Sequence, residues 1–195
     1  LVCRYEDKAQ QINEKSFGFS PQSRVWAAHH CADHISKQIL GYDLGYAARI
    51  AYVTAENPNV VMQTDVHFAN TTLLFEAVGP VTAMAWSAKA QRLAYVVKVD
   101  DQYRLMIYDR RTREHQLVHR IQAPIYAPSW SDEKTLYFSQ FVHELPKIMM
   151  WHGQKVQQVT YGKDLDLMPY TYKGALYYLS DHTGPTAVYV KRPNG

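Results

Sequence analysis

The densest group of potential metal ligands lies within six consecutive residues. His29, His30, Cys31, Asp33 and His34 fall in a stretch with helical periodicity. His30 and His34 stand four positions apart, the spacing at which two helix side chains can hold one zinc ion. No glutamate lies between them to act as a base, and His29 falls on the apolar stripe. We therefore predict no metal site, and we expect His29 to be hydrogen-bonded between the helix and a sheet.

Catalytic side chains form no recognisable arrangement in the chain. The sequence has no Gly-x-Ser-x-Gly elbow, and its nine histidines are scattered. The net charge is only +3, and the basic residues 110–113 stand beside Asp109 and Glu114, as is typical of a solvated turn. We therefore predict no catalytic residue, no cofactor and no nucleic-acid binding.

The two cysteines, Cys3 and Cys31, leave two interpretations open. They could pair in an oxidising compartment, or they could be two small buried apolar residues. We favour the second interpretation. No stretch approaches the roughly 20 apolar residues that cross a bilayer. The chain starts without Met or a recognisable leader, so we read it as a mature or truncated form.

Residues 1–47 have the pattern of part of a small α/β domain. Leu1–Tyr5 and Gln11–Phe17 are predicted as two short strands. Apolar residues then recur at helical spacing from Val25 to Ile39, with Ser23 as the expected N-cap. Gly41 suits the left-handed residue that ends a helix.

From residue 48 onward the spacing is that of strands, and the pattern repeats about every forty residues. Trp86 and Trp130 occupy the same place in successive copies, and so do Leu136 and Leu176. A repeated all-strand unit of this length indicates β-propeller blades. We predict about three and a half blades over residues 48–195, so that the fold is mainly β with an incomplete ring.

The first blade, which includes Ile50, lacks the strand that precedes its counterparts in later copies. That strand is the one nearest the propeller axis, and we expect it to come from the far end of a longer chain, because joining the ends removes exposed strand edges. We therefore expect residues 1–195 to be a fragment. Both faces of each blade must be apolar for blades to stack, and we expect Trp86 and Trp130 to wedge between neighbouring blades.

These residues resemble the TolB family. The helix Ala28-His29-His30-Cys31-Ala32-Asp33-His34-Ile35 ends at Leu40-Gly41 and leads into the strand Ala48-Arg49-Ile50-Ala51-Tyr52-Val53, as at the domain junction of that family. The resemblance covers nearly the whole chain. The family's Pro-Asp-Gly turn is replaced by residues 88–90, 132–134 and 172–174, which indicates a distant member.

The resemblance implies a non-enzymatic periplasmic scaffold of the Tol–Pal system. In that family one end of the propeller channel receives the lipoprotein Pal, and the N-terminal domain engages TolA. It also implies a role in outer-membrane integrity and cell division, with peripheral membrane association through Pal and no membrane span. The family position of His29 is structural.

The Pal surface of the family is built from the loops that enter the innermost strand of each blade. Small residues there would let a partner approach the backbone closely. The matching positions in this chain are Pro80, Val81, Thr82, Ala83, Pro124, Ile125, Tyr126, Ala127, Asp166, Leu167 and Met168.

Two other functions remain open at this stage. A similar propeller gates prolyl-oligopeptidase-like serine peptidases, although the α/β unit before the blades fits TolB better. A propeller that binds an unrelated peptide or carbohydrate would show aromatic residues at the channel mouth, where Tyr126 is the one candidate.

Overall fold

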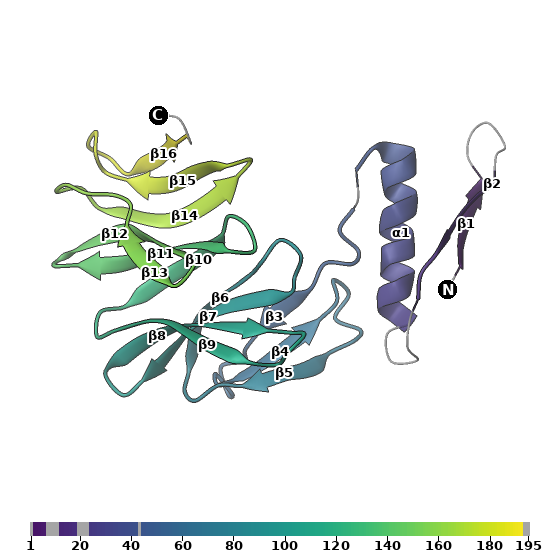
Figure 1. Ribbon diagram of the computed structural model, residues 1–195, viewed down its shortest axis with the longest axis horizontal. Coiled ribbons are helices and arrows are strands. Elements are labelled where there is room, and N and C mark those ends of the chain that lie inside the picture. The colour runs from purple at the N-terminus through teal and green to yellow at the C-terminus, as the bar shows by residue number, and fades with distance from the viewer. Residues whose placement is uncertain (1, 7–11, 19–23, 43, 193–195) are drawn as a thin grey trace. The chain divides into compact units, whose positions relative to one another are not determined.

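The chain forms one helix-containing unit and one unit of stacked sheets. The computed structural model describes residues 2–6, 12–18, 24–42 and 44–192. The first compact unit holds residues 1–51 with 62–74, and the second holds 52–61 with 75–195 (Figure 1). The elements in the order of the chain are β1 Val2–Glu6, β2 Ile12–Ser16, α1 Arg24–Leu40, β3 Ile50–Tyr52, β4 Val60–Thr64, β5 Thr72–Glu76, β6 Val81–Trp86, β7 Arg92–Val99, β8 Gln102–Asp109, β9 His115–Ile121, β10 Ile125–Trp130, β11 Thr135–Val142, β12 Leu145–His152, β13 Lys155–Gln158, β14 Asp166–Tyr172, β15 Ala175–Ser180 and β16 Ala187–Lys191.

In the first unit, the antiparallel pair β1–β2 precedes α1. Gly41 has φ of 84° and donates its N–H to the carbonyl of Lys37, as predicted for the end of the helix. The predicted N-cap, Ser23, lies outside the described residues. The preferred interpretation of the cysteines is wrong, because Cys3 and Cys31 form a disulfide that joins β1 to α1. Two separately buried cysteines and a bonded pair leave the same residue pattern, so the sequence does not show that their sulfur atoms meet.

Two carboxylates hold the loops of the first unit in place. Asp33 on α1 accepts the backbone N–H groups of Tyr46 and Ala47, both at 2.8 Å. Asp65 is fully buried and accepts the N–H groups of His67 and Ala69 and the side-chain amide of Asn70. These residues form the junction between the helix and the first blade.

The surroundings of His29 differ from the expectation. Its Nε2 is buried and makes no hydrogen bond to any described residue, and it lies 3.7 Å from Oδ2 of Asp65. The imidazole packs edge-on against Trp26 and lies against the ring of His67, with centroids 5.9 Å and 5.7 Å away. His29 therefore lies within ion-pair distance of Asp65, although its Nε2 does not make the expected hydrogen bond.

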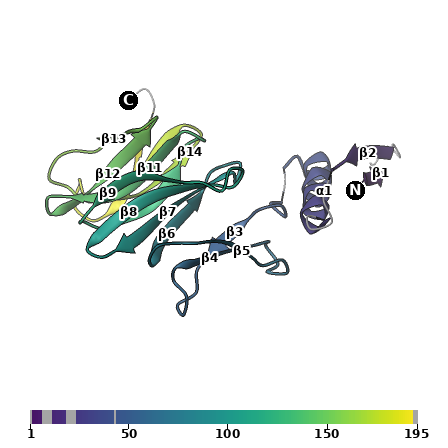
Figure 2. The same ribbon diagram turned by 60° about the horizontal axis from the view of Figure 1, so that its bottom comes forward.

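The second unit contains successive antiparallel sheets, each made from consecutive strands. Two have four strands, in the orders β6-β7-β8-β9 and β10-β11-β12-β13. The sheet β14-β15-β16 has three, and so does the sheet β3-β4-β5, whose residues are divided between the two units. Figure 2 shows the sheets from β6 onward stacked as blades, which confirms the mainly β fold with an incomplete ring.

The core lies between the first two four-stranded sheets. Ala94, Val96, Leu105 and Ile107 present one apolar face, and Ile125, Trp130, Leu136, Phe138, Met149 and Trp151 cover it. The opposite face of β7 presents Tyr95, which packs against Phe75 of β5 at 4.9 Å between ring centroids. Because alternate residues of β7 are buried on both faces, the strand has little polar content. The predicted wedge of Trp130 between blades is confirmed.

The buried Asp65 should make the first unit sensitive to acid. The hydrogen bonds, chiefly that from Asn70, lower the pKa of Asp65 to about 2 from an ordinary value of 3.8. A depressed folded-state pKa stabilises the fold above pH 3.8, and this stabilisation is lost as the pH falls toward 2. Asn70→Ala should therefore move acid unfolding of the unit to a higher pH. Circular dichroism at 222 nm measures it, since α1 is the helix of the described chain, and the exposed Asn57→Ala serves as the control. An unchanged midpoint would contradict the assigned role of Asn70.

Candidate functional site

The innermost strand of each complete or partial blade from β6 onward has an irregularity near its beginning. The register with the next strand shifts between Val81 and Ala83 in β6. It shifts between Tyr126 and Ser129 in β10, and between Leu167 and Tyr170 in β14. β-Bulges of this kind turn side chains away from the regular pleat and are over-represented next to functional sites.

In β10 and β14 the bulge places an ordinary residue in the left-handed region. Ala127 has φ of 44° and Met168 has φ of 54°, and a proline follows each. Residues other than glycine adopt this conformation at a cost. The prolines, Pro128 and Pro169, are buried, so the backbone is fixed on the C-terminal side of the strained residue. The chain therefore holds Ala127 and Met168 in a defined orientation.

These bulges border a hollow on the three inner strands. Its volume is about 340 Å³. Met168 and Tyr170 are exposed on it, at 58% and 62% of their surface. The lining residues are Ala85, Trp86, Ala88, Ala127, Pro128, Ser129, Trp130, Met168, Pro169, Tyr170 and Thr171. None of these side chains carries a charge, so the hollow suits an apolar or aromatic partner segment.

The structure brings only some of the predicted site residues to this hollow. Ala127 and Met168 line it. Pro80 and Thr82 are exposed where β6 begins, and Ala83 is half-buried on the same strand. Pro124 is half-buried, and the exposed Tyr126 packs edge-on against Phe141 at 5.9 Å between ring centroids.

The remaining predicted residues point elsewhere. Ile125 is 1% exposed and belongs to the core, and Val81 is also buried. Leu167 is half-buried. Asp166 is 4% exposed, and its Oδ2 accepts a hydrogen bond from Nζ of the buried Lys147 at 3.2 Å. Asp166 therefore has a partner within the blades.

Sequence reasoning missed the residues that follow the entry loops. These residues lie on the strands themselves, and their recurring pattern predicts only blade packing. They are Trp86, Pro128, Pro169 and Tyr170. The sequence contains one signal for them: a residue followed by proline recurs at the same position in successive copies, as Ala127-Pro128 and Met168-Pro169.

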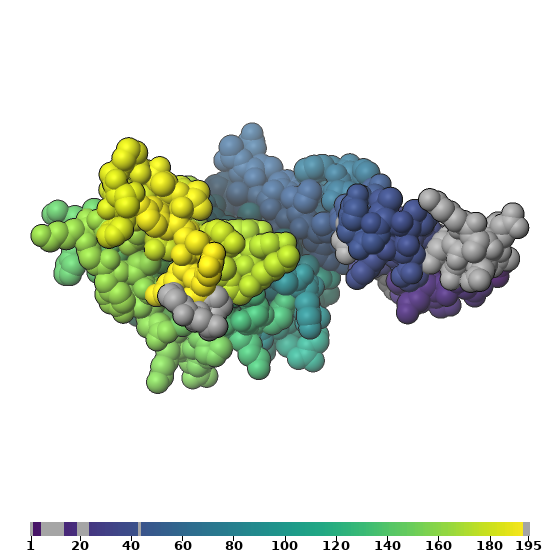
Figure 3. Space-filling view, turned by 90° about the horizontal axis from the view of Figure 1, so that it is seen from above, coloured from purple at the N-terminus to yellow at the C-terminus, as the bar shows by residue number. Residues whose placement is uncertain are grey.

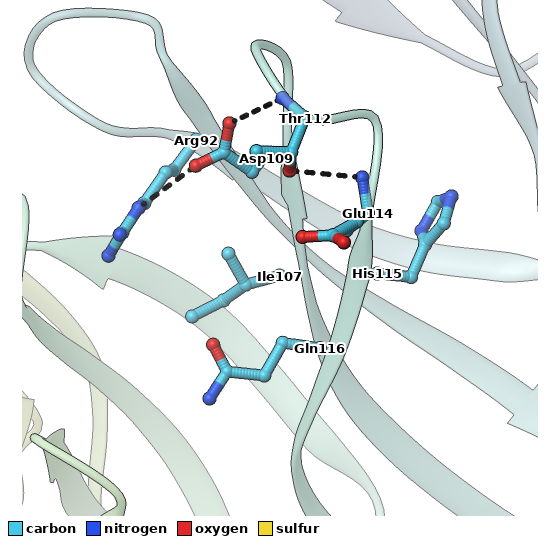
Figure 4. A pocket seen from close by; sticks show the side chains of 7 residues that line it. All are labelled: Arg92, Ile107, Asp109, Thr112, Glu114, His115 and Gln116. Atoms are coloured by element: carbon cyan, nitrogen blue, oxygen red, sulfur yellow. Dashed lines mark hydrogen bonds and ion pairs between the residues drawn. The ribbon is translucent and has the colours of Figure 1, made fainter.

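A second, polar cleft of about 570 Å³ lies at the outer strands of the sheet β6–β9 (Figure 4). Arg92 and Asp109 face one another there, with Nε and Oδ2 3.7 Å apart. Asp109 also accepts the N–H groups of Arg111 and Thr112, and chiefly the latter bond lowers the pKa of Asp109. Arg92 donates in addition to the carbonyl of Glu133. These charges shape a turn and join neighbouring sheets.

The histidine of this cleft does not form an acid–base pair with its acidic neighbour. In Figure 4 the ring of His115 points away from Glu114. Nδ1 of His115 lies 2.9 Å from the hydroxyl of Tyr95. Burial lowers the pKa of His115 and raises that of Tyr95 to about 12, so both groups are neutral near pH 7. In this cleft His115 is therefore paired with Tyr95 and not with Glu114.

Two further properties concern the described residues. They contain no group of three or more His, Cys, Asp or Glu side chains placed to hold a metal ion. The helix they contain is too short and too polar to cross a membrane.

The curated relatives described here carry one name. No protein-family model matches the chain. It is 30% identical over 90 residues to the Tol-Pal system protein TolB of Aromatoleum aromaticum, covering 46% of this chain and 21% of that protein. It is 26% identical over 109 residues to TolB of Actinobacillus succinogenes, covering 55% of this chain and 26% of that protein.

Solved structures agree with this relationship. The crystal structure of TolB from Acinetobacter baumannii superposes with a TM-score of 0.80 over 98% of this chain, at 20% identity, and the chain spans 51% of it. A puromycin-hydrolysing peptidase of Mycobacterium tuberculosis reaches a TM-score of 0.57 over 75% of this chain, at 15% identity. The chain thus shares its blades with several proteins, and the comparisons confirm its resemblance to a distant or partial TolB.

Proposed function

We propose that this chain is the N-terminal and early propeller part of a periplasmic, non-enzymatic scaffold of the Tol–Pal system. The relatives that carry the Tol-Pal name support the system. The uncharged hollow on β6, β10 and β14 is the single observation that supports the site. In this proposal the lipoprotein Pal binds there, and residues 1–47, as part of an α/β domain, connect the blades to TolA.

The chemistry of the hollow supports a protein partner. Aromatic and methionine side chains at a concave surface are typical of residues that contribute most of the binding energy in protein interfaces. Trp86, Met168 and Tyr170 provide such side chains, and Ala85 and Ala127 leave room between them. The fixed bulges at Ala127 and Met168 reduce the entropy lost on binding.

The disulfide supports the proposed compartment. Disulfides form and persist in oxidising compartments such as the bacterial periplasm, and are rare in the cytosol. The bond between Cys3 and Cys31 connects two separate elements of the first unit. Association with the outer membrane would be peripheral and would run through Pal.

Calorimetric titration tests the proposal. The protein in its natural full length should bind the soluble domain of Pal from the same organism saturably, and Met168→Asp should weaken this binding at least about 10-fold, because it places a charge in an apolar contact. The matched control is Met106→Leu, a half-buried position on β8 away from the hollow. A folded protein that does not bind Pal would reject the partner.

The peptidase likeness supports a second candidate, a propeller that gates a serine peptidase. The likeness to the M. tuberculosis peptidase covers 75% of this chain, whereas that to TolB covers 98%. The TolB match therefore includes nearly all of the helix-containing unit, which favours the scaffold. Labelling of the full-length protein by a fluorophosphonate, which reacts with active-site serines, would support the peptidase instead.

A further inference from the structure

Two arginines face one another on the outer strands of the sheet β6–β9. Arg104 of β8 pairs with Arg120 of β9 in the antiparallel register, and Leu105 pairs with His119. Leu105 belongs to the core, and Nε2 of His119 lies 2.7 Å from Oε1 of Gln140 in the next sheet. Because side chains alternate along a strand, Arg104 and Arg120 lie together on the opposite face.

The arginine pair has no counter-charge within the sheet. Like charges directly opposite one another on neighbouring strands destabilise a sheet. No carboxylate of the described residues forms an ion pair with either guanidinium. Val97 pairs with Arg104 on its other side, and Met106 with Leu117 is the next pair along this face, so its neighbours there are uncharged. The two positive charges are therefore held close together without neutralisation by the described chain.

Arg104 has a second unfavourable feature. The residue is half-buried, and its Nε is buried without a hydrogen-bond partner among the described residues. A buried N–H without an acceptor costs free energy, and folded proteins rarely leave one. Because Nε makes no hydrogen bond, the guanidinium loses none there when it turns toward an acceptor. Arg120 is exposed, so a ligand can reach the pair from its side.

An irregularity in β9 brings the second arginine onto this face. The register of β8 with β9 shifts between Leu105 and Met106, beside the arginine pair. Arg120 lies opposite Arg104, and His115 lies opposite Tyr108, which is on the same face of β8. In a regular strand Arg120 and His115 would point to opposite faces, and the bulge lets them share one. Bulges re-aim side chains in this way and are over-represented next to functional sites.

We propose that Arg104 and Arg120 form a binding site for a phosphate group. Side chains directly opposite on neighbouring strands have Cβ atoms about 4.5–5.5 Å apart, so both guanidinium groups can reach one anion. The phosphate is either free in solution or part of a lipid headgroup, and the chemistry of recognition is the same. The inference rests on the sheet β6–β9 alone and does not depend on Pal.

The two guanidinium groups define the chemistry of the ligand. Each presents its N–H groups as a planar fork that binds two oxygens of one phosphate or carboxylate. A carboxylate has only two oxygens and one charge, which leaves the second arginine unneutralised. A terminal phosphate group carries a charge of about −1.5 to −2 at pH 7 and three acceptor oxygens, so it can serve both forks. Its binding would replace the repulsion between the arginines with attraction to a shared anion.

Equilibrium dialysis of the full-length protein against radiolabelled inorganic phosphate tests for free phosphate. Saturable binding is expected, and Arg120→Gln should weaken it at least about 10-fold, because it removes charge-assisted hydrogen bonds. Arg120→Lys keeps the charge but not the fork and should also weaken binding. The matched control is Arg113→Gln, which removes the same charge from the exposed turn between β8 and β9 and should bind like the wild type.

Vesicle flotation tests for a lipid-borne phosphate. The probes are phosphatidylcholine vesicles with and without phosphatidic acid, whose headgroup is a phosphate monoester. Retention that requires both phosphatidic acid and Arg120 would assign the site to a lipid headgroup. Binding of inorganic phosphate without such retention would assign it to free phosphate.

Three results would overturn the inference. They are the absence of binding to both probes, equal binding by the wild type and Arg120→Gln, and an equal loss in the Arg113→Gln control, which would show that only net charge matters. Circular dichroism verifies that each variant is folded. If Arg120→Gln does not fold, Arg120→Lys makes the same comparison, since it keeps a long cationic side chain at an exposed position.

Discussion

Replacing Ala127 with tryptophan is expected to weaken Pal binding at least about 100-fold while the blades stay folded. Ala127 lines the hollow, and an indole there would occupy space that a partner side chain must enter. The left-handed φ of 44° is already held by a residue with a Cβ, so the larger side chain adds little backbone strain. Calorimetric titration of the full-length protein measures the loss.

The control for this prediction is Ala127→Gly. Glycine adopts a positive φ without steric cost, and the relief of strain offsets the greater freedom of the unfolded chain. The variant should bind Pal like the wild type, with a similar melting temperature. Unchanged binding by a folded Ala127→Trp would show that the partner does not use the hollow.

Removing the charge of Asp166 should cost about 3–5 kcal/mol of unfolding free energy. The side chains of Lys147 and Asp166 are only 4% and 6% exposed. Asp166→Asn would leave the Lys147 ammonium buried without its counter-charge, apart from its hydrogen bond to the Asp164 carbonyl. Urea unfolding followed by tryptophan fluorescence measures the change. The exposed Glu114→Gln, in the same unit, should change it by less than about 0.5 kcal/mol.

The double variant Lys147→Met with Asp166→Leu tests whether stability depends on the ion pair itself or only on filling its place in the blades. Apolar side chains of similar volume often replace a buried ion pair without loss of stability. This variant should therefore recover most of the stability lost in Asp166→Asn. A single variant as stable as the wild type would mean that water reaches the pair, and the assigned role of Asp166 would then be wrong.

The blades could be predicted from the sequence because their signal is repeated. Alternation of apolar residues at Leu93 to Val96 gives the strand, and the recurrence of Trp86 and Trp130 gives the period. The disulfide could not be predicted, since the contact of Cys3 with Cys31 depends on how β1 packs on α1. Local pattern does not define that packing.

The site was predictable only in part, for a related reason. The entry loops place Ala127 and Met168 near the hollow, but a left-handed backbone is usually signalled by glycine, and neither bulge has one. Burial of Ile125 and Asp166 depends on contacts between blades, which residue type alone does not reveal. The surroundings of His29, whose Nε2 makes no hydrogen bond to a described residue, likewise depend on where the Asp65 loop lies.

The link between inner strands determines how far a local disturbance travels. Between sheets, the inner strands are linked in chain order: the hydroxyl of Thr171 in β14 donates to the carbonyl of Trp130 in β10, and Nε1 of Trp130 donates to the carbonyl of Ala85 in β6. Stability in such an array is a sum of single-blade and nearest-neighbour contributions. A change that destabilises one blade should therefore destabilise the adjacent blade and have little effect on the stability of the blade after it. A disturbance in the sheet β14–β16, which is yellow in Figure 3, should therefore reach β10–β13 before it reaches β6–β9.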